Sequence, residues 1–253
     1  MMSYLKLLEN STKERRVIAF HEVKNRENFY RRIQWLNKNY DILPLADLLN
    51  VSDILPRKRV QIAITFDDGY ESWYEIVLPV LKEMRVPATF FVCSGFIGLS
   101  GENLINFTNK RLKRKQILQP LSIAQLCKLT DEALFDIGSH TATHADLGEK
   151  CDLNQEITED KIVLEKLTGR LVNWFSYPFG RMKNISPEAK DYLQKLGFRA
   201  AFTIIPGFIE KSSDMFLIGR DSLDCEMPDW FWKAWLGGVF DSFSKYKEKL
   251  LNL

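Results

Sequence analysis

The sequence lacks most features of membrane-spanning, secreted and disulfide-bonded proteins. Its 253 residues include only three histidines and four cysteines. No run of about 18 apolar residues occurs, so we expect no membrane span. The cysteines are far apart and form no CxxC pair, which favours buried or free thiols over disulfides or zinc ligands. The first residues carry early charges and no apolar signal segment, so we expect a cytoplasmic location, with peripheral membrane association left open.

An excess of charge of one sign is also absent. Lysine and arginine total 35 against 33 aspartates and glutamates, a net charge of +2. This balance argues against a nucleic-acid partner, which would require a broad basic face. One basic run, Lys110–Lys115, stands out. A solvated helix face or loop is the ordinary interpretation, and a rim that attracts phosphate or an acidic sugar is the alternative.

Short apolar runs alternate with segments of helical periodicity, a pattern typical of a single α/β domain with a mostly parallel sheet. The segment Ser94–Leu121 is the least regular, and we expect it to be an insertion over one mouth of the fold. The seven predicted strands indicate a barrel or a doubly wound sheet. They are Arg16–His21, Val60–Phe66, Ala88–Cys93, Leu134–Gly138, Asn173–Tyr177, Arg199–Ile204 and Phe216–Arg220. The predicted helices are Glu27–Asn39, Glu71–Arg85, Ser122–Leu129, Asn154–Leu167 and Pro187–Leu196.

Polar residues with catalytic potential fall at the ends of these predicted strands. Parallel α/β folds build their sites at the carboxyl ends of their strands, so we expect these residues to meet. Agreement among five strand ends is stronger evidence than any single motif. The residues are His21, Asp67 with Asp68, His140, Pro178 and Arg220.

Two of these strand ends suggest a metal site. Asp67 and Asp68 are adjacent, and bringing both carboxylates into one pocket requires a cation nearby. A helix cap or a simple turn is the alternative interpretation of this pair. His140 and His144 are four residues apart, a spacing that places two imidazoles on one side of a helical segment. Two histidines and one aspartate form a metal triad with open positions for water and substrate.

Three motifs in order, TFDDGY, HTATH and SYPFG, resemble those of the polysaccharide deacetylase family. This family is carbohydrate esterase family 4, defined by the NodB homology domain. The resemblance covers roughly residues 15–240 and includes the flanking segments VIAFHEV and VPATFFVCSGFIG. It implies a distorted (β/α)7 barrel formed by one catalytic domain over residues 1–253.

The resemblance also implies roles for the motif residues. Asp68, His140 and His144 would bind one divalent metal ion, and Asp67 would be the general base. Zn²⁺ is the metal we expect, with Co²⁺, Ni²⁺, Mn²⁺ or Fe²⁺ as alternatives.

The third motif implies substrate contacts. In the Pro178-Phe179-Gly180 segment, the backbone N–H at Phe179 would help to hold the oxyanion. Tyr70, Tyr177 and Phe179 would offer aromatic faces to a sugar ring, although ordinary core packing is the alternative. The family often has an arginine at the Ser176 position to pair with the base, and serine cannot replace it.

Many family members also place a proton-donating histidine near the C-terminus, where this sequence has none. His21, in FHEV, resembles instead the histidine of the permuted branch that includes poly-N-acetylglucosamine deacetylases. A core histidine is the alternative. We expect Arg220 to steady Asp67 and Asp221 to orient His21, with an ordinary surface ion-pair group as the alternative.

These assignments predict a metal-dependent hydrolase that removes an N-acetyl group from an amino sugar or glycan in polysaccharide or cell-envelope biosynthesis. Without a secretory signal, the expected substrate is a nucleotide- or lipid-linked sugar or a short glycan. A deformylase or another small-amide hydrolase of the same fold is one alternative. A catalytically inactive carbohydrate-binding relative is another.

Overall fold

The strands of the protein form from short apolar and β-branched runs that are buried on both faces, as expected for a parallel sheet covered by helices. The computed structural model describes residues 15–50, 59–239 and 241. All six positions of the first strand are buried. The strands are β1 (Arg15–Phe20), β2 (Asp41–Ile42), β3 (Gln61–Asp68), β4 (Ala88–Val92), β5 (Phe135–Ser139), β6 (Trp174–Ser176), β7 (Ala200–Phe202) and β8 (Asp221–Ser222).

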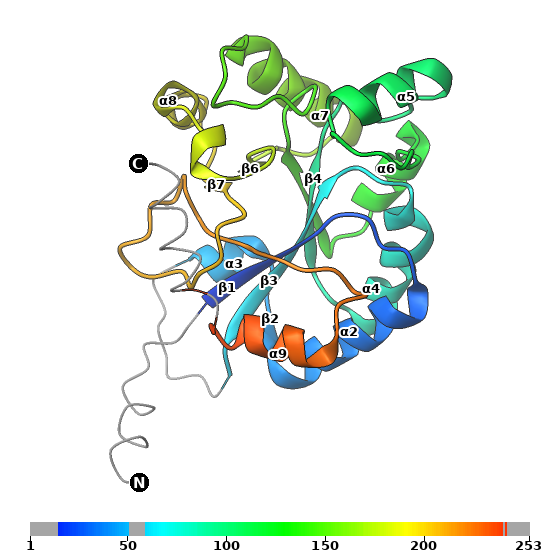
Figure 1. The fold of residues 1–253 in the computed structure, drawn as a ribbon, viewed down its shortest axis with the longest axis vertical. Coiled ribbons are helices and arrows are strands. Elements are labelled where there is room, and N and C mark those ends of the chain that lie inside the picture. The colour runs from blue at the N-terminus through cyan, green and yellow to red at the C-terminus, as the bar shows by residue number, and fades with distance from the viewer. Residues whose placement is uncertain (1–14, 51–58, 240, 242–253) are drawn as a thin grey trace, which may run out of the picture.

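All strand pairs are parallel, in the order β7-β6-β5-β4-β3-β1-β8, and β2 pairs with the start of β3. The sheet curls into a half-barrel with helices around its outside (Figure 1). One late segment connects its two edges: Ile218 bridges to Phe202 in β7, and β8 pairs with β1. Residues near position 220 therefore lie beside residues near position 20.

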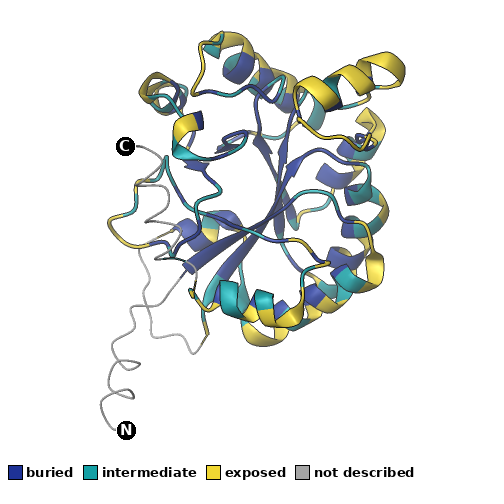
Figure 2. Cartoon of the chain, viewed as in Figure 1, coloured by how far each residue is buried: buried dark blue, intermediate teal, exposed yellow. Residues whose placement is uncertain are grey.

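The helices cover the outer surface and bury one side each against the sheet (Figure 2). Asn25 and Ser122 accept hydrogen bonds from the first turns of the helices that they precede, which satisfies otherwise unpaired N–H groups. A π-helical turn leads into each of α4 and α7. The helices are α2 (Arg26–Asn39), α3 (Leu45–Leu49), α4 (Leu78–Met84), α5 (Gly101–Lys110), α6 (Ile123–Thr130), α7 (Asp160–Thr168), α8 (Pro187–Lys195) and α9 (Asp229–Leu236).

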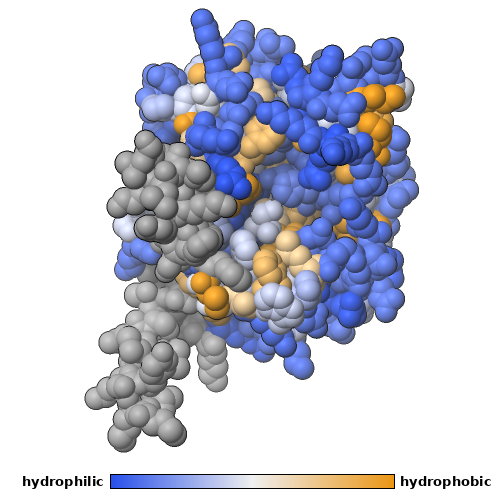
Figure 3. Space-filling view, viewed as in Figure 1, coloured by the Kyte–Doolittle hydropathy of each residue, from blue (hydrophilic) through white to orange (hydrophobic). Residues whose placement is uncertain are grey.

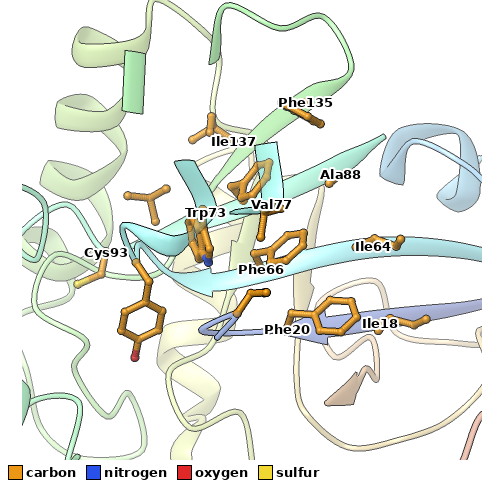
Figure 4. Close-up of a cluster of buried hydrophobic side chains, with 14 of the residues drawn as sticks. Ile18, Phe20, Ile64, Phe66, Trp73, Val77, Ala88, Cys93, Phe135 and Ile137 are labelled. Atoms are coloured by element: carbon orange, nitrogen blue, oxygen red, sulfur yellow. The ribbon is translucent and has the colours of Figure 1, made fainter. Parts of the chain in front are cut away.

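Alternation along β3 divides its side chains between the two faces of the sheet. Phe66 points to the outer core, where its ring centroid lies 5.4 Å from that of Phe20 and 5.0 Å from that of Phe90 (Figure 4). Ala63 belongs to the second apolar cluster, inside the curl. Asp67 is in phase with Ala63, so the same alternation places its carboxylate on the inner face.

The structure confirms the (β/α)7-type fold and five helices, and it corrects one strand. Six predicted strands are present, but Phe216–Arg220 is not one, because only Ile218 bridges to a neighbour and the paired residues are Asp221–Ser222. The insertion Ser94–Leu121 contains α5. The ends of the predicted domain, residues 1–14 and 242–253, lie outside the described residues.

Neither disulfides nor a membrane-spanning helix is expected from the sequence. All four cysteines are free thiols. No helix in the described part of the chain combines the length and apolarity needed to cross a membrane. On the face in Figure 3, hydrophilic residues predominate and hydrophobic ones form separate patches.

Candidate metal centre and catalytic pocket

Three buried side chains from two strand ends converge on one point. Asp68 ends β3, and His140 and His144 follow β5. The Nε2 atoms of both histidines lie 3.4 Å from Asp68 Oδ1, and one ligand atom of each residue lies within 4.8 Å of the others. The predicted triad is therefore brought together.

Backbone carbonyls orient both imidazoles. His140 Nδ1 lies 2.7 Å from the Ser176 carbonyl oxygen, and His144 Nδ1 lies 3.1 Å from that of Arg111. A carbonyl only accepts, so each Nδ1 carries a proton, and in the neutral form of each imidazole Nε2 presents a lone pair. Histidine ligands of metals characteristically make this hydrogen bond with their second ring nitrogen.

The donor set fits a divalent cation. Asp68 Oδ1 is buried and has no hydrogen-bond partner in the described part of the chain. Burial alone would raise the pKa of Asp68, but His140 and His144 outweigh it and hold the pKa well below its usual value. An anionic oxygen beside two imidazole lone pairs matches the ligand preferences of Zn²⁺ and related metals.

Strained backbone holds these ligands. Asp68, Thr141 and His144 have φ values of 91°, 65° and 55°, and Phe179 has 60°. Such left-handed conformations cost about 1–3 kcal/mol each in non-glycine residues and cluster at functional sites. The ligand geometry is thus maintained by the surrounding fold and not by local preference.

Two buried acids missed by the sequence analysis anchor the HTATH segment. Glu156 accepts hydrogen bonds from the backbone N–H and the hydroxyl of Thr143, at 2.9 and 2.7 Å. Asp160 accepts from the Ser139 hydroxyl at 2.5 Å and from the Ser94 N–H at 3.0 Å. Both acids come from the helical segment after the motif, and only their burial distinguishes them from surface carboxylates.

Loss of the metal is the expected result of replacing either histidine ligand. The purified protein should carry about one divalent ion per chain, and His140→Ala or His144→Ala should lose it because two remaining ligands hold zinc poorly. Elemental analysis after gel filtration measures this. His21→Ala, which removes the chain's third histidine, is the matched control and should retain the ion. Unchanged metal content in both ligand variants would refute the assignment.

Asp67 lies beside the triad in a buried ion pair. Arg220 Nη1 donates to Asp67 Oδ1 at 2.7 Å, and Nη2 donates to Oδ2 at 2.5 Å. Burial would raise the pKa of Asp67, but the Arg220 guanidinium outweighs it and lowers the pKa. Arg220 also contacts the hydroxyls of Thr65 and Ser176, at 3.0 and 2.7 Å. Both partners are buried, so the surface ion-pair interpretation of Arg220 is wrong.

The ion pair predicts a large effect on stability. Arg220→Met should lower the free energy of unfolding by about 3–5 kcal/mol, because it leaves a buried carboxylate without a counter-charge. Adding Asp67→Asn should recover part of this loss. Urea unfolding in the presence of a chelator measures both. Lys190→Met, which breaks the exposed pair with Asp214, should cost less than about 1 kcal/mol. A similarly small cost for Arg220→Met would contradict this prediction.

His21 lines the same cavity as Asp67 and Asp68. Its backbone carbonyl accepts from Trp73 Nε1 at 2.8 Å, which fixes the chain as it leaves β1. Burial lowers the pKa of His21, and the two carboxylates act in the opposite direction.

The structure corrects the role predicted for Asp221. Both oxygens of Asp221 accept from Arg16 Nη1, at 2.9 and 2.8 Å, and Trp235 Nε1 donates to Oδ1 at 3.0 Å. Asp221 therefore neutralises Arg16 and does not orient His21. Arg220 and Asp221 point to opposite sides of the chain because successive side chains of an extended segment alternate in direction.

The aromatic residues differ in their access to the cavity. Tyr177 and Phe179 line it, whereas Pro178 is buried outside the lining. Tyr70 is 1% exposed and packs edge-on against Phe96, so the prediction that its ring faces a sugar is wrong. Burial, and then the nearby Asp68 carboxylate, raise the pKa of Tyr70.

The cavity has a volume of about 100 Å³. This is below the roughly 300–1,000 Å³ typical of pockets that enclose a whole small-molecule ligand. The lining also includes Phe179, whose backbone N–H donates to no backbone carbonyl among the residues that the structure describes. The lining residues are His21, Asp67, Asp68, Leu112, Arg114, His140, His144, Tyr177, Phe179 and Ile204.

Comparison with known protein families matches residues 55–201 to the polysaccharide deacetylase family. This match covers more than half of the chain, and the protein belongs to that family. A relative named poly-beta-1,6-N-acetyl-D-glucosamine N-deacetylase, from Staphylococcus epidermidis, is 26% identical over 230 residues, which cover 83% of this chain and 74% of the relative.

Solved structures show the same fold. IcaB from Ammonifex degensii superposes with a TM-score of 0.68 at 20% identity, covering 90% of this chain and 97% of that one. A Bacillus cereus polysaccharide deacetylase gives a TM-score of 0.66 at 21% identity, covering 85% of this chain. This chain spans 66% of that longer protein.

Proposed function

We propose that the protein is a metal-dependent hydrolase that removes the acetyl group from an N-acetylated amino sugar or glycan. The observation that carries this proposal is the convergence of Asp68, His140 and His144 beside the Asp67–Arg220 pair in one cavity. Asp68, His140 and His144 would hold the metal. When bound, a divalent metal of this kind makes water a better nucleophile and polarises the carbonyl that is attacked.

Asp67 is the base in this proposal. Its carboxylate is anionic because the Arg220 guanidinium lowers its pKa, and Asp67 lines the same cavity as Asp68. Arg220 and Ser176 hold both oxygens in place, so Asp67 accepts a proton from water without first reorienting. Arg220 thus supplies, from the last part of the barrel, the cation that Ser176 cannot.

His21 is the acid. An amine leaves an amide only when it is protonated, so a donor must face the nitrogen. His21 is the one remaining histidine in the cavity lining, and burial makes its protonated form a stronger acid. Phe179 lines the same cavity, and in this proposal its backbone N–H stabilises negative charge on the carbonyl oxygen.

Release of acetate from a panel of N-acetylated sugars tests the proposal. Short β-1,6-linked N-acetylglucosamine oligomers, chitin oligomers and monomeric sugars should be offered with added Zn²⁺, Co²⁺ or Ni²⁺. Matched N-formyl sugars separate a deacetylase from a deformylase. Formate release without acetate release would replace the proposed activity, and release of neither by metal-loaded protein would refute it.

A further inference from the structure

The basic run Lys110–Lys115 lies at the catalytic cavity and not on a remote helix face. Helix α5 ends at Lys110, and the remaining residues form the loop after it. Leu112 and Arg114 line the cavity. His144 donates to the Arg111 carbonyl oxygen at 3.1 Å, so the same loop orients a candidate metal ligand. The loop that carries the run therefore both lines the cavity and orients a candidate metal ligand.

The backbone of this loop is constrained. Leu112 is 6% exposed, and its N–H donates to the Phe107 carbonyl. The Arg114 N–H donates to the Thr108 carbonyl at 3.1 Å. Lys113, between them, adopts a left-handed conformation with φ of 52°. Such a conformation is uncommon for a residue other than glycine, and it sets the direction in which the side chain leaves the backbone.

Lys113 lies next to a residue that lines the cavity, and Arg114 lines it directly. Lys113 Nζ lies 4.6 Å from the ring centroid of Phe179, whose ring packs against His144 at 4.7 Å. The Arg114 guanidinium lies 5.7 Å from the ring centroid of Tyr70. Both side chains are exposed, and each has its cation near an aromatic ring beside the catalytic cavity.

The cations of the run have no acidic partner in the described part of the chain. None of its five lysines and arginines forms an ion pair within residues 15–50, 59–239 and 241. By contrast, the buried cations Arg220 and Arg16 are neutralised by Asp67 and Asp221. The cavity carboxylates are already committed, Asp67 to Arg220 and Asp68 to the candidate metal site. Lys113 and Arg114 are therefore available to bind an anionic group of a ligand.

We infer that the substrate carries an anionic group, a phosphate or a carboxylate, next to its N-acetylated sugar unit, and that Lys113 and Arg114 bind this group. This inference rests on the proposed deacetylase function. A cavity of about 100 Å³ admits the acetamido end of a sugar but not the ring. The ring and its substituents then lie at the rim, where the two cations are. Arginine and lysine both bind phosphate and carboxylate oxygens.

Kinetics on three substrates test the inference. N-acetylglucosamine 1-phosphate supplies a phosphate, N-acetylglucosamine linked to glucuronic acid supplies a carboxylate, and N,N′-diacetylchitobiose is neutral. The double variant Lys113→Asn/Arg114→Gln should raise KM for an anionic substrate about tenfold, the scale of one charge-assisted contact, with kcat unchanged. Asparagine is chosen because it tolerates the left-handed backbone. KM for the neutral substrate should not change.

Matched controls separate this effect from net charge. Lys166→Gln/Lys195→Gln removes two exposed cations that do not line the cavity, and it should leave all three KM values unchanged. Added salt should raise KM for the anionic substrates with the native protein and much less with the variant. A phosphate-specific or carboxylate-specific effect identifies the group. Equal KM changes for the neutral and both anionic substrates would overturn the inference.

A binding measurement tests the inference independently of turnover. Glucosamine 1-phosphate and glucosamine, both already deacetylated, should be titrated calorimetrically into the protein. The native protein should bind the phosphate more tightly, and Lys113→Asn/Arg114→Gln should lose that difference. If no substrate is turned over but the difference in binding persists, the proposed function fails while the anion site stands. If the two ligands bind the native protein equally, the anion site is refuted.

Discussion

Asp67→Asn is expected to lower kcat by at least about 100-fold, the usual scale for removing a general base. Asparagine keeps the shape of the side chain and its contacts with Ser176, but it cannot accept the proton. Asp67 makes no contribution to the ligand set of Asp68, His140 and His144, so the metal content should stay at one ion per chain. Acetate release and elemental analysis on the same preparation measure both quantities.

The exposed Asp191→Asn variant is the matched control and should retain native turnover. Loss of the metal along with the activity would show that Asp67 supports the metal site and is not the base. Retained turnover in the metal-loaded Asp67→Asn protein would move the role of the base to another residue. The two measurements together therefore distinguish a chemical role from a structural one.

His21→Ala is expected to lower kcat/KM for an N-acetylated sugar by about 100-fold. For an activated aryl acetate, whose leaving group needs no proton, the loss should be much smaller, because attack by water does not involve His21. The difference between amide and ester is therefore the diagnostic measurement.

Metal content and the free energy of unfolding should be unchanged in His21→Ala, since its imidazole is outside the triad. Tyr177→Phe is a useful companion, because it alters another residue of the cavity lining without removing a histidine. Equal losses on amide and ester would show that His21 acts in binding or folding and not in proton transfer.

Much of the fold could be predicted because buried parallel strands appear as short apolar runs. Six of these runs are strands, and the capping residues mark helix starts such as Ile123 and Pro187. The last strand was predicted at Phe216–Arg220 because this run is apolar. Its Ile218 is apolar because it packs into the inner cluster, and the residues that pair with β1 begin only at Asp221. Strand β2, with two residues, is too short to leave a periodic signal.

The site was predictable where motif residues are adjacent and unpredictable where contacts span the chain. Asp68, His140 and His144 belong to compact motifs, and the structure brings them together. The partner of Asp221 is Arg16, 205 residues away, and no local pattern connects them. Glu156 and Asp160 resemble ordinary helix carboxylates in sequence, and their burial depends on tertiary packing.

The connection of the two sheet edges by the last segment is expected to set when the proposed catalytic site is completed during synthesis. Asp67 and Arg220 are 153 residues apart, so a nascent chain that has emerged only through β7 contains the triad residues but no counter-ion for Asp67. Contacts of such long sequence separation slow folding, because the chain must first close a large loop. Hydrolytic activity is therefore expected to emerge late in translation and to follow β1–β8 pairing in refolding experiments.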